Sequence, residues 1–282
     1  MTVSPSSKAI SSVPQSASTT PEPGPGPTPY PKSDWPDHKV IGYYGVDEAR
    51  FMGPNAVPWQ YLTHVCFAFG SIGSDYRVNI SEQGMSVMTD VFAAASAAGV
   101  KPILSIGGWG LGSAGYSAMV SSNATRHIFI QSLQDYVEEY GVTGVDLDWE
   151  WPGRESDPVV PYNNVTDIPN FLLLLQDLRN AFGNNITLSA AVASTSPLTS
   201  DMSPFAKYMD WVGLMMYDFA AGNLNETTAD APLWSAGDDE GYPDSIEAGV
   251  DIWVQSGMPK SKMVLGIPSY GRSFTLKNVS SG

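Results

Sequence analysis

Short apolar runs recur along the chain from about residue 40, and helix-like stretches separate most of them. The runs predict β-strands at residues 40–44, 64–69, 102–106, 144–150, 186–192, 211–217 and 263–269. The intervening stretches predict helices at residues 85–98, 125–140, 168–182 and 244–256. Near-continuous apolar strands that alternate with helices indicate parallel strands covered on both faces. Seven such units over roughly 240 residues predict an α/β fold of the (β/α)8 TIM barrel type, with a doubly wound open sheet as the alternative.

The fourth predicted strand ends in an unusual octet, Gly-Val-Asp-Leu-Asp-Trp-Glu-Trp, at residues 144–151. Because strand side chains alternate between faces, Asp146, Asp148 and Glu150 are expected to share one face, about 6–7 Å apart in succession. Ionised carboxylates are costly to bury unless they are paired or share protons. An edge strand with a solvated acidic face is the structural alternative. The apolar opposite face and the flanking tryptophans favour a row of acids that tunes one pKa for acid–base chemistry.

In a barrel of this type the functional site lies at the C-terminal ends of the strands. The residues so placed are Tyr43 on the first strand, Ser105, Gly107, Gly108 and Trp109 at the third, Glu150 at the fourth, Tyr217 and Asp218 at the sixth, and Tyr270 and Arg272 after the seventh. Aromatic faces suit the apolar faces of sugar rings, and carboxylates suit hydroxyls and a glycosidic oxygen. The alternatives are structural: tight glycine packing, Met215 in the core, Tyr43 closing the barrel floor, and Arg272 pairing with a barrel acid. Trp211 and Trp253 are assigned to the core.

The octet resembles the Asp-x-x-Asp-x-Asp-x-Glu signature of glycoside hydrolase family 18, the chitinases. Ser105-Ile-Gly-Gly108 is similar to that family's Ser-x-Gly-Gly motif, and Met215-Met-Tyr217-Asp218 to its Met-x-Tyr-Asp motif. The segments at residues 266–272 and 230–233 resemble its seventh-strand motif and a loop after the sixth strand. The resemblance covers residues 39–278 in the expected order and is strongest to fungal secreted chitinases.

The resemblance implies a role for each matching acid and tyrosine. Glu150 is expected to protonate the leaving oxygen and then to activate water. Asp148 is expected to hold the substrate N-acetamido group, and Asp146 to share a proton with Asp148. Tyr217 is expected to donate to the acetamido carbonyl, and Asp218 to bind sugar hydroxyls. The implied substrate-binding residues are Tyr43, Gly108, Trp109, Gly110, Trp151, Met215, Tyr270 and Arg272.

These roles imply an endo-acting chitinase that cleaves β-1,4 bonds between N-acetylglucosamine residues with retention, assisted by the substrate's own acetamido group. The implied partners are chitin or chitooligosaccharides, in chitin catabolism or cell-wall remodelling. Two other functions of the same fold remain open. One is a chitin-binding lectin with weak or no activity, which the glutamate at position 150 argues against. The other is an endo-β-N-acetylglucosaminidase that acts on N-glycan cores.

The chain departs from the family pattern in two places. Thr143 stands where family members usually have an aspartate, which affects the expected tuning of Asp146. The family also has an eighth strand with a floor tryptophan, whereas the last tryptophan here is Trp253 and the chain stops at Gly282. We therefore expect strands 1–7 to be recognisable, strand 8 to be missing, and the barrel to be C-terminally incomplete, weakly active and marginally stable.

Composition excludes several classes of partner. Acids outnumber bases 29 to 14, and the formal charge of −15 argues against nucleic acid and anionic membranes. The single cysteine, Cys66, cannot form an internal disulfide, and the three histidines show no metal-ligand spacing. We expect no cofactor, no metal and a monomeric protein.

The N-terminal composition and the glycosylation motifs bear on domains and location. Residues 1–36 are rich in Ser, Thr, Pro and Gly and predict a disordered segment ahead of a catalytic barrel at residues 37–282. No signal peptide is visible in the chain. Six Asn-x-Ser/Thr sequons nevertheless favour a secreted, extracellular glycoprotein: Asn79, Asn123, Asn164, Asn185, Asn225 and Asn278.

Overall fold

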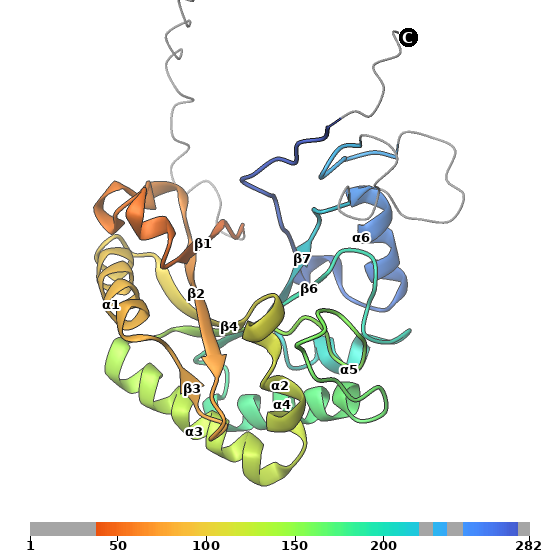
Figure 1. Cartoon of the computed structure of the whole chain (residues 1–282), viewed down its shortest axis with the longest axis horizontal. Helices are drawn as coiled ribbons and strands as arrows, with labels where there is room; N and C mark the ends of the chain where they lie inside the picture. The colour runs from red at the N-terminus through yellow and green to blue at the C-terminus, as the bar shows by residue number, and fades with distance from the viewer. Residues whose placement is uncertain (1–37, 220–227, 236–244, 276–282) are drawn as a thin grey trace, which may run out of the picture. The chain divides into compact units, whose positions relative to one another are not determined.

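Seven parallel strands form one curved sheet in which each strand pairs with the next in chain order (Figure 1). The computed structural model describes residues 38–219, 228–235 and 245–275, so the predicted disordered segment 1–36 lies outside the described residues. The strands are β1 Ile41–Gly45, β2 His64–Ile72, β4 Lys101–Gly107, β5 Gly144–Asp148, β6 Thr187–Ala193, β7 Trp211–Met215 and β8 Met263–Leu265. A doubly wound sheet reverses its strand order near the middle, and this one does not. The barrel-type topology is therefore confirmed.

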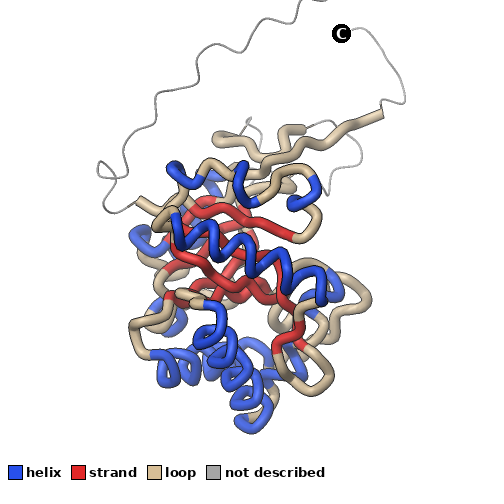
Figure 2. The backbone as a smooth tube through the Cα atoms, turned by 90° about the vertical axis from the view of Figure 1, so that its left-hand side faces the viewer, coloured by secondary structure: helices blue, strands red, loops and turns tan. Residues whose placement is uncertain are grey.

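Helices on the outer side of the sheet connect these strands, as Figures 1 and 2 show. The long ones are α1 Glu82–Ala97, α3 Asn123–Tyr140, α4 Asp167–Phe182 and α6 Ile246–Gln255, and two short ones are α2 Tyr116–Val120 and α5 Ser203–Ala206. Serine side chains begin three of the long helices, since Ser81, Ser122 and Ser245 each accept a hydrogen bond from a backbone N–H of the first turn. The four predicted helices are thus present, although α2, α5 and the short strand β3 Val78–Asn79 were not predicted.

The main core lies between the sheet and the helices. Val145, Leu147 and Trp149 point into it from the acidic strand, which confirms the predicted apolar face. The indole of Trp149 stacks on Tyr116 with ring centroids 5.0 Å apart and meets Phe171 of α4 edge-on at 5.7 Å. Burying each of these side chains contributes about 1.5–3 kcal/mol. The octet is therefore anchored from behind by its own apolar residues.

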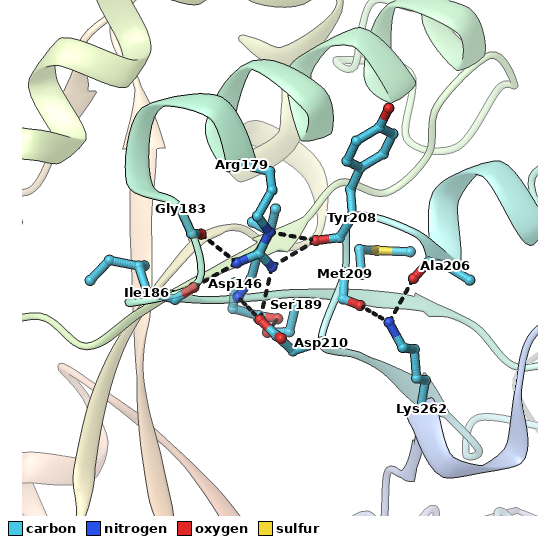
Figure 3. A network of polar contacts seen from close by, with 11 residues as sticks. Asp146, Arg179, Gly183, Ile186, Ser189, Ala206, Tyr208, Met209, Asp210 and Lys262 are labelled. Carbon is cyan, nitrogen blue, oxygen red and sulfur yellow. Dashed lines mark hydrogen bonds and ion pairs between the residues drawn. The ribbon is translucent and has the colours of Figure 1, made fainter.

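A polar network lies where α4 ends and where the chain enters β6, β7 and β8 (Figure 3). The guanidinium of Arg179, near the end of α4, donates to the carbonyls of Gly183, Ile186 and Tyr208 and pairs with Asp210 at 2.9 Å. Lys262 donates to two further carbonyls, those of Ala206 and Met209, each at 2.7 Å. These cations satisfy carbonyls that the helix end and loops leave without backbone partners, and so hold the loops that enter β6, β7 and β8.

Three predicted strands are too long at their C-terminal ends. Strand β5 ends at Asp148 rather than at residue 150, β7 at Met215 rather than 217, and β8 at Leu265 rather than 269. In each case the chain turns into the loop that forms the site, for example where the Met216 amide donates to the Leu214 carbonyl at 2.8 Å. Alternation of side chains continues past the last ladder bond, so a sequence pattern overestimates strand length there.

Strands β1 and β8 are the two ends of the strand path, and within the described ranges no strand pairs with the outer edge of either. Residues near these edges are correspondingly exposed, with Tyr43 at 48%, Leu265 at 45% and Ile267 at 82%. The sheet therefore curves like a barrel wall without meeting itself in the described part of the chain.

Two consecutive glycines at the end of β4 permit a close backbone approach. Gly107 has φ +115°, and a Cβ built there lies 2.0 Å from the carbonyl oxygen of Asp148. Gly108 has φ +88°, and a Cβ built there lies 3.1 Å from the ring of Phe69, while the Gly108 amide donates to the same Asp148 carbonyl at 2.9 Å. The glycines of the Ser-x-Gly-Gly motif thus bring β4 against the acidic strand.

Gly107→Ala is expected to destabilise the protein far more than Gly141→Ala. Gly141 ends α3 at φ +65° with no atom within 4 Å of the added Cβ, so only the left-handed backbone cost of about 1–2 kcal/mol applies. At Gly107 a collision with backbone adds to that cost. Urea unfolding of both variants measures the difference in the free energy of unfolding. Equal losses would contradict the close approach.

Candidate active site

Asp146 lies in a row of residues that the parallel register places side by side. Ser105 of β4 and Ser189 of β6 are its direct neighbours in register. Their hydroxyls donate to its carboxylate at 2.7 and 2.6 Å, and the hydroxyl of Tyr43 on β1 donates at 3.0 Å. Burial raises the pKa of Asp146, while these three hydrogen bonds oppose the rise because they favour the charged form. Asp146 is 1% exposed, so a buried carboxylate is held by hydroxyls from three other strands.

Asp148 lies one step further along the same face and is 4% exposed. Its Oδ1 atom is buried without a hydrogen-bond partner in the described structure. Burial, followed by the charges of Glu150 and Asp146, raises its pKa well above the ordinary value. The hydrogen bonds of Asp146 are made with hydroxyls rather than with Asp148, so the acid at 148 is free to bind a ligand. A buried polar atom without a partner costs free energy that a bound donor would recover.

Glu150 lies just beyond the end of β5 and is half-buried. Burial and then the charge of Asp218 raise its pKa from 4.5 to about 7. A carboxyl with a pKa near neutrality can donate a proton in one step and accept one in the next. Its backbone is held on both sides, because its amide donates to the Ser113 hydroxyl at 2.8 Å and its carbonyl accepts from Ser156 at 2.8 Å.

A second group of polar residues follows β7 and β8. Asp218 has φ +62°, accepts a hydrogen bond from the Tyr270 hydroxyl at 2.8 Å and pairs with Arg272. Arg272 also contacts Asp230 at 3.1 Å. Arg272 therefore makes the contacts expected from the structural alternative, in which it pairs with an acid of the site. Burial, with a contribution from the charge of Asp148, raises the pKa of Tyr217, which keeps its hydroxyl protonated and able to donate.

Aromatic side chains lie on the loops that follow β4, β5, β7 and β8. The indole of Trp109 is 60% exposed, and that of Trp151 is half-buried with the Arg154 guanidinium 4.8 Å from its centre. The rings of Tyr217 and Tyr270 meet edge-on at 6.1 Å. Exposed indole and phenol faces beside carboxyl groups suit a carbohydrate better than a charged ligand.

The other predicted binding residues serve the site in different ways. Gly108 and Gly110 are buried backbone positions with positive φ, and Met215 is half-buried at the end of β7. The Tyr43 ring is partly exposed, but its hydroxyl lies deep beside Asp146, and burial raises its pKa. Tyr43 therefore contacts an acid of the site directly, through the hydrogen bond from its hydroxyl to Asp146.

Sequence reasoning missed two residues that hold the site, Ser189 and Ser113. Ser189 is the only polar side chain in the middle of an otherwise apolar strand that begins with Thr187, and that contrast was a usable signal. Ser113 lies in a glycine-rich loop where nothing in the pattern distinguishes it. Thr143, the departure from the family signature, donates to the Pro102 carbonyl at 2.8 Å and not to Asp146.

The arrangement offers acid–base chemistry within the described residues. No group of three or more His, Cys, Asp or Glu side chains in this part of the chain is placed to hold a metal ion. No helix in the described ranges has the length and apolar character that a membrane crossing requires.

Known proteins share both the sequence and the fold. The family model described as "Glycosyl hydrolases family 18" matches residues 39–282. Mouse chitotriosidase-1 is 31% identical over 252 residues, which cover 84% of this chain and 53% of the mouse protein. Catalytic domain 2 of the Group II chitinase from Ostrinia furnacalis superposes with a TM-score of 0.76 at 28% identity, covering 87% of this chain and 68% of that one. YKL-39, solved in the presence of chitooligosaccharides, superposes with a TM-score of 0.75 at 25% identity, covering 87% of this chain and 70% of that one.

The chain spans about half the length of most of the curated relatives it matches. The matched segment nevertheless contains the acidic row, the glycine pair and the Met-x-Tyr-Asp end of β7 in the order described above. With the parallel curved sheet, the buried acids and the family match in agreement, the chain belongs to glycosyl hydrolase family 18.

Proposed function

We propose that this protein hydrolyses β-1,4 bonds between N-acetylglucosamine residues of chitin or chitooligosaccharides. One observation carries the proposal: the buried Asp148 carboxyl, whose Oδ1 has no hydrogen-bond partner, lies two residues from Glu150, whose pKa is about 7. The first group can accept a hydrogen bond from the N–H of a substrate amide, and the second can donate a proton to a leaving oxygen. The printed names of the mouse and insect relatives support the same substrate class, as do the YKL-39 crystal structures solved in the presence of chitooligosaccharides.

The mechanism follows from having one acid at the strand end. Retaining enzymes with a protein nucleophile need two carboxyl groups about 5–5.5 Å apart on opposite sides of the bond. Here Asp146 and Asp148 lie on β5 and Glu150 follows just beyond its end, all on one chain segment, so the substrate supplies the nucleophile. Glu150 gives its proton to the glycosidic oxygen as the C1–oxygen bond breaks. The acetamido carbonyl oxygen then bonds to C1 and forms a cyclic cation.

The second half of the reaction uses the same groups. Glu150, now a carboxylate, takes a proton from water as the water oxygen bonds to C1 and the acetamido oxygen leaves. Two displacements at C1 give net retention. Asp148 hydrogen-bonds the acetamido N–H and so orients its carbonyl oxygen. Tyr217 donates to that carbonyl, and the charge of Asp146 contributes to the raised pKa of Asp148.

We further propose that the protein cuts the polymer internally. The exposed indole of Trp109 and the half-buried indole of Trp151 lie on the loops after β4 and β5, which suits a polymer that binds across the site and is cut internally. We propose that the protein acts as a monomer in chitin catabolism or cell-wall remodelling.

We also propose that the protein is secreted and glycosylated. The sequon asparagines Asn79, Asn123, Asn164 and Asn185 are all exposed. The other two sequons, at Asn225 and Asn278, lie outside the described residues. Exposure of every described sequon supports an extracellular route, because attached glycans need room at the surface.

Glu150→Gln is expected to abolish hydrolysis of chitotetraose while leaving its binding largely intact. Glutamine keeps the shape and polarity of the side chain but cannot transfer the proton, and general acid–base catalysis contributes about 10²–10⁴-fold. Chromatography of the products measures turnover, and calorimetry measures binding. Near-normal turnover by this variant would remove Glu150 from the proposed role.

Substrates that lack the N-acetyl group at the cleaved position are expected to be hydrolysed far more slowly than acetylated ones. Without the acetamido oxygen no nucleophile is placed at C1, and Asp148 loses its ligand. Asp148→Asn should reduce the rate on acetylated chitotetraose with little change in unfolding temperature. Equal rates on partly deacetylated and fully acetylated tetramers would contradict substrate assistance.

The pH dependence should follow the Glu150 carboxyl. The first step needs its protonated form, so kcat should fall as pH rises through about 7. Between pH 4.5 and about 7 the folded protein holds a proton on Glu150 that the unfolded chain releases, so stability should decline as pH rises through this window. Glu150→Gln removes that part of the decline. Thermal unfolding at pH 4.5 and pH 8 tests this, and parallel losses in both proteins would contradict it.

A further inference from the structure

The side chain of Ser113 joins three backbone segments around the proposed acid. Ser113 is 0% exposed and ends a short 3-10 turn, Gly110–Ser113. Its hydroxyl oxygen accepts the Glu150 amide at 2.8 Å, and the hydroxyl donates to the carbonyl of Gly108 at 2.8 Å, with that of Asp148 at 3.2 Å. One hydroxyl has one hydrogen to give, so the Gly108 carbonyl, the nearer acceptor, is its main partner.

The turn that carries Ser113 is itself fixed against β4. A Cβ built on Gly112 lies 2.0 Å from the Gly107 carbonyl oxygen, so the two backbones are in direct contact. The Gly108 amide in turn donates to the Asp148 carbonyl. Contacts with β4 therefore fix the position of Ser113. Its hydrogen bond with the Glu150 amide in turn fixes the chain that follows β5.

Glu150 needs such a support because it lies beyond the sheet. The β5 ladder ends with the pair Gly107 and Asp148 on one side and Leu147 and Ala190 on the other. The next residue, Trp149, is held by its indole in the core. The Glu150 amide has no ladder partner and donates to the Ser113 hydroxyl instead.

We infer that the Ser113 hydroxyl is a positioning group that sets the location of the Glu150 carboxyl by binding its backbone amide. The inference deepens the proposed function, and rests on it for its effect on the rate. The charged and titratable groups that interact with this carboxyl are Asp148, Asp218 and Tyr217. Loss of the support would let the carboxyl move toward water and away from Asp218, so its proton would be held less tightly.

Ser113→Ala tests the inference, and Ser132→Ala is a matched control. Ser132 is 2% exposed, accepts the Val78 amide at 2.9 Å and donates to the Phe129 carbonyl at 2.7 Å, which is the same pair of bonds away from the site. Both variants lose a buried hydroxyl. Only Ser113→Ala should lower kcat on chitotetraose, by about 10- to 100-fold with KM little changed, as misplacement of a catalytic group does.

A second readout does not depend on turnover. The titration of Glu150 can be followed by 13C NMR of glutamate-labelled protein, with Glu150→Gln assigning the signal. Ser113→Ala should lower the Glu150 pKa from about 7 toward 4.5, and Ser132→Ala should leave it unchanged. If the unaltered chain does not hydrolyse chitotetraose but this shift appears, the proposed function fails and the positioning role stands. If kcat and titration are the same in both alanine variants, the positioning role is overturned.

Ser113→Thr and Ser113→Val form a second pair of equal volume for the case in which Ser113→Ala does not fold. Both add the same bulk to a buried site, and only threonine keeps the hydroxyl. The inference expects threonine to retain the raised Glu150 pKa and valine to lose it. Identical titrations in the two variants would overturn it.

Discussion

A carboxylate in the middle of a sheet has to receive its hydrogen bonds from neighbouring strands. Asp146 is such a carboxylate, and the rest of the site depends on how its hydrogen bonds are supplied. Ser105 and Ser189 meet it because parallel register places them beside the acid, and Tyr43 completes it from the first strand. Isolated ionised carboxylates are too costly to bury, whereas one with three donors is tolerated. The pKa of this acid is then set by burial, which raises it, and by the three hydrogen bonds, which lower it.

Asp146 and Asp148 of β5, with Glu150 just beyond its end, show how position along one chain segment creates different chemical properties. Asp146 is deepest and saturated with donors, Asp148 is buried with an oxygen left over, and Glu150 is half-buried near Asp218. The three share similar chemistry in the unfolded chain. Folding separates them because each successive residue is closer to solvent and meets a different set of neighbours.

The strand pattern was enough to predict all seven strands and four helices, because apolar periodicity reflects burial directly. Strand ends were overestimated at β5, β7 and β8, since alternation continues where the ladder stops. The candidate catalytic acids could be named from the octet, but the residues that support them could not. Ser113 and Ser189 act through register and loop packing, which bring together residues 37 and 43 positions away in sequence. The short strand β3 left too few residues for any periodicity to appear.

Tyr43 gives the terminal strand β1 an influence beyond its own stability. Within the described residues β1 is bonded along one side only, and such strands open locally more readily than central ones. Each such opening would carry the phenol hydroxyl of Tyr43 away from Asp146 and leave that charge with two donors in place of three. The ionisation of Asp146 is thus thermodynamically linked to the order of β1. Any interaction that keeps β1 in place also favours the charged form of Asp146.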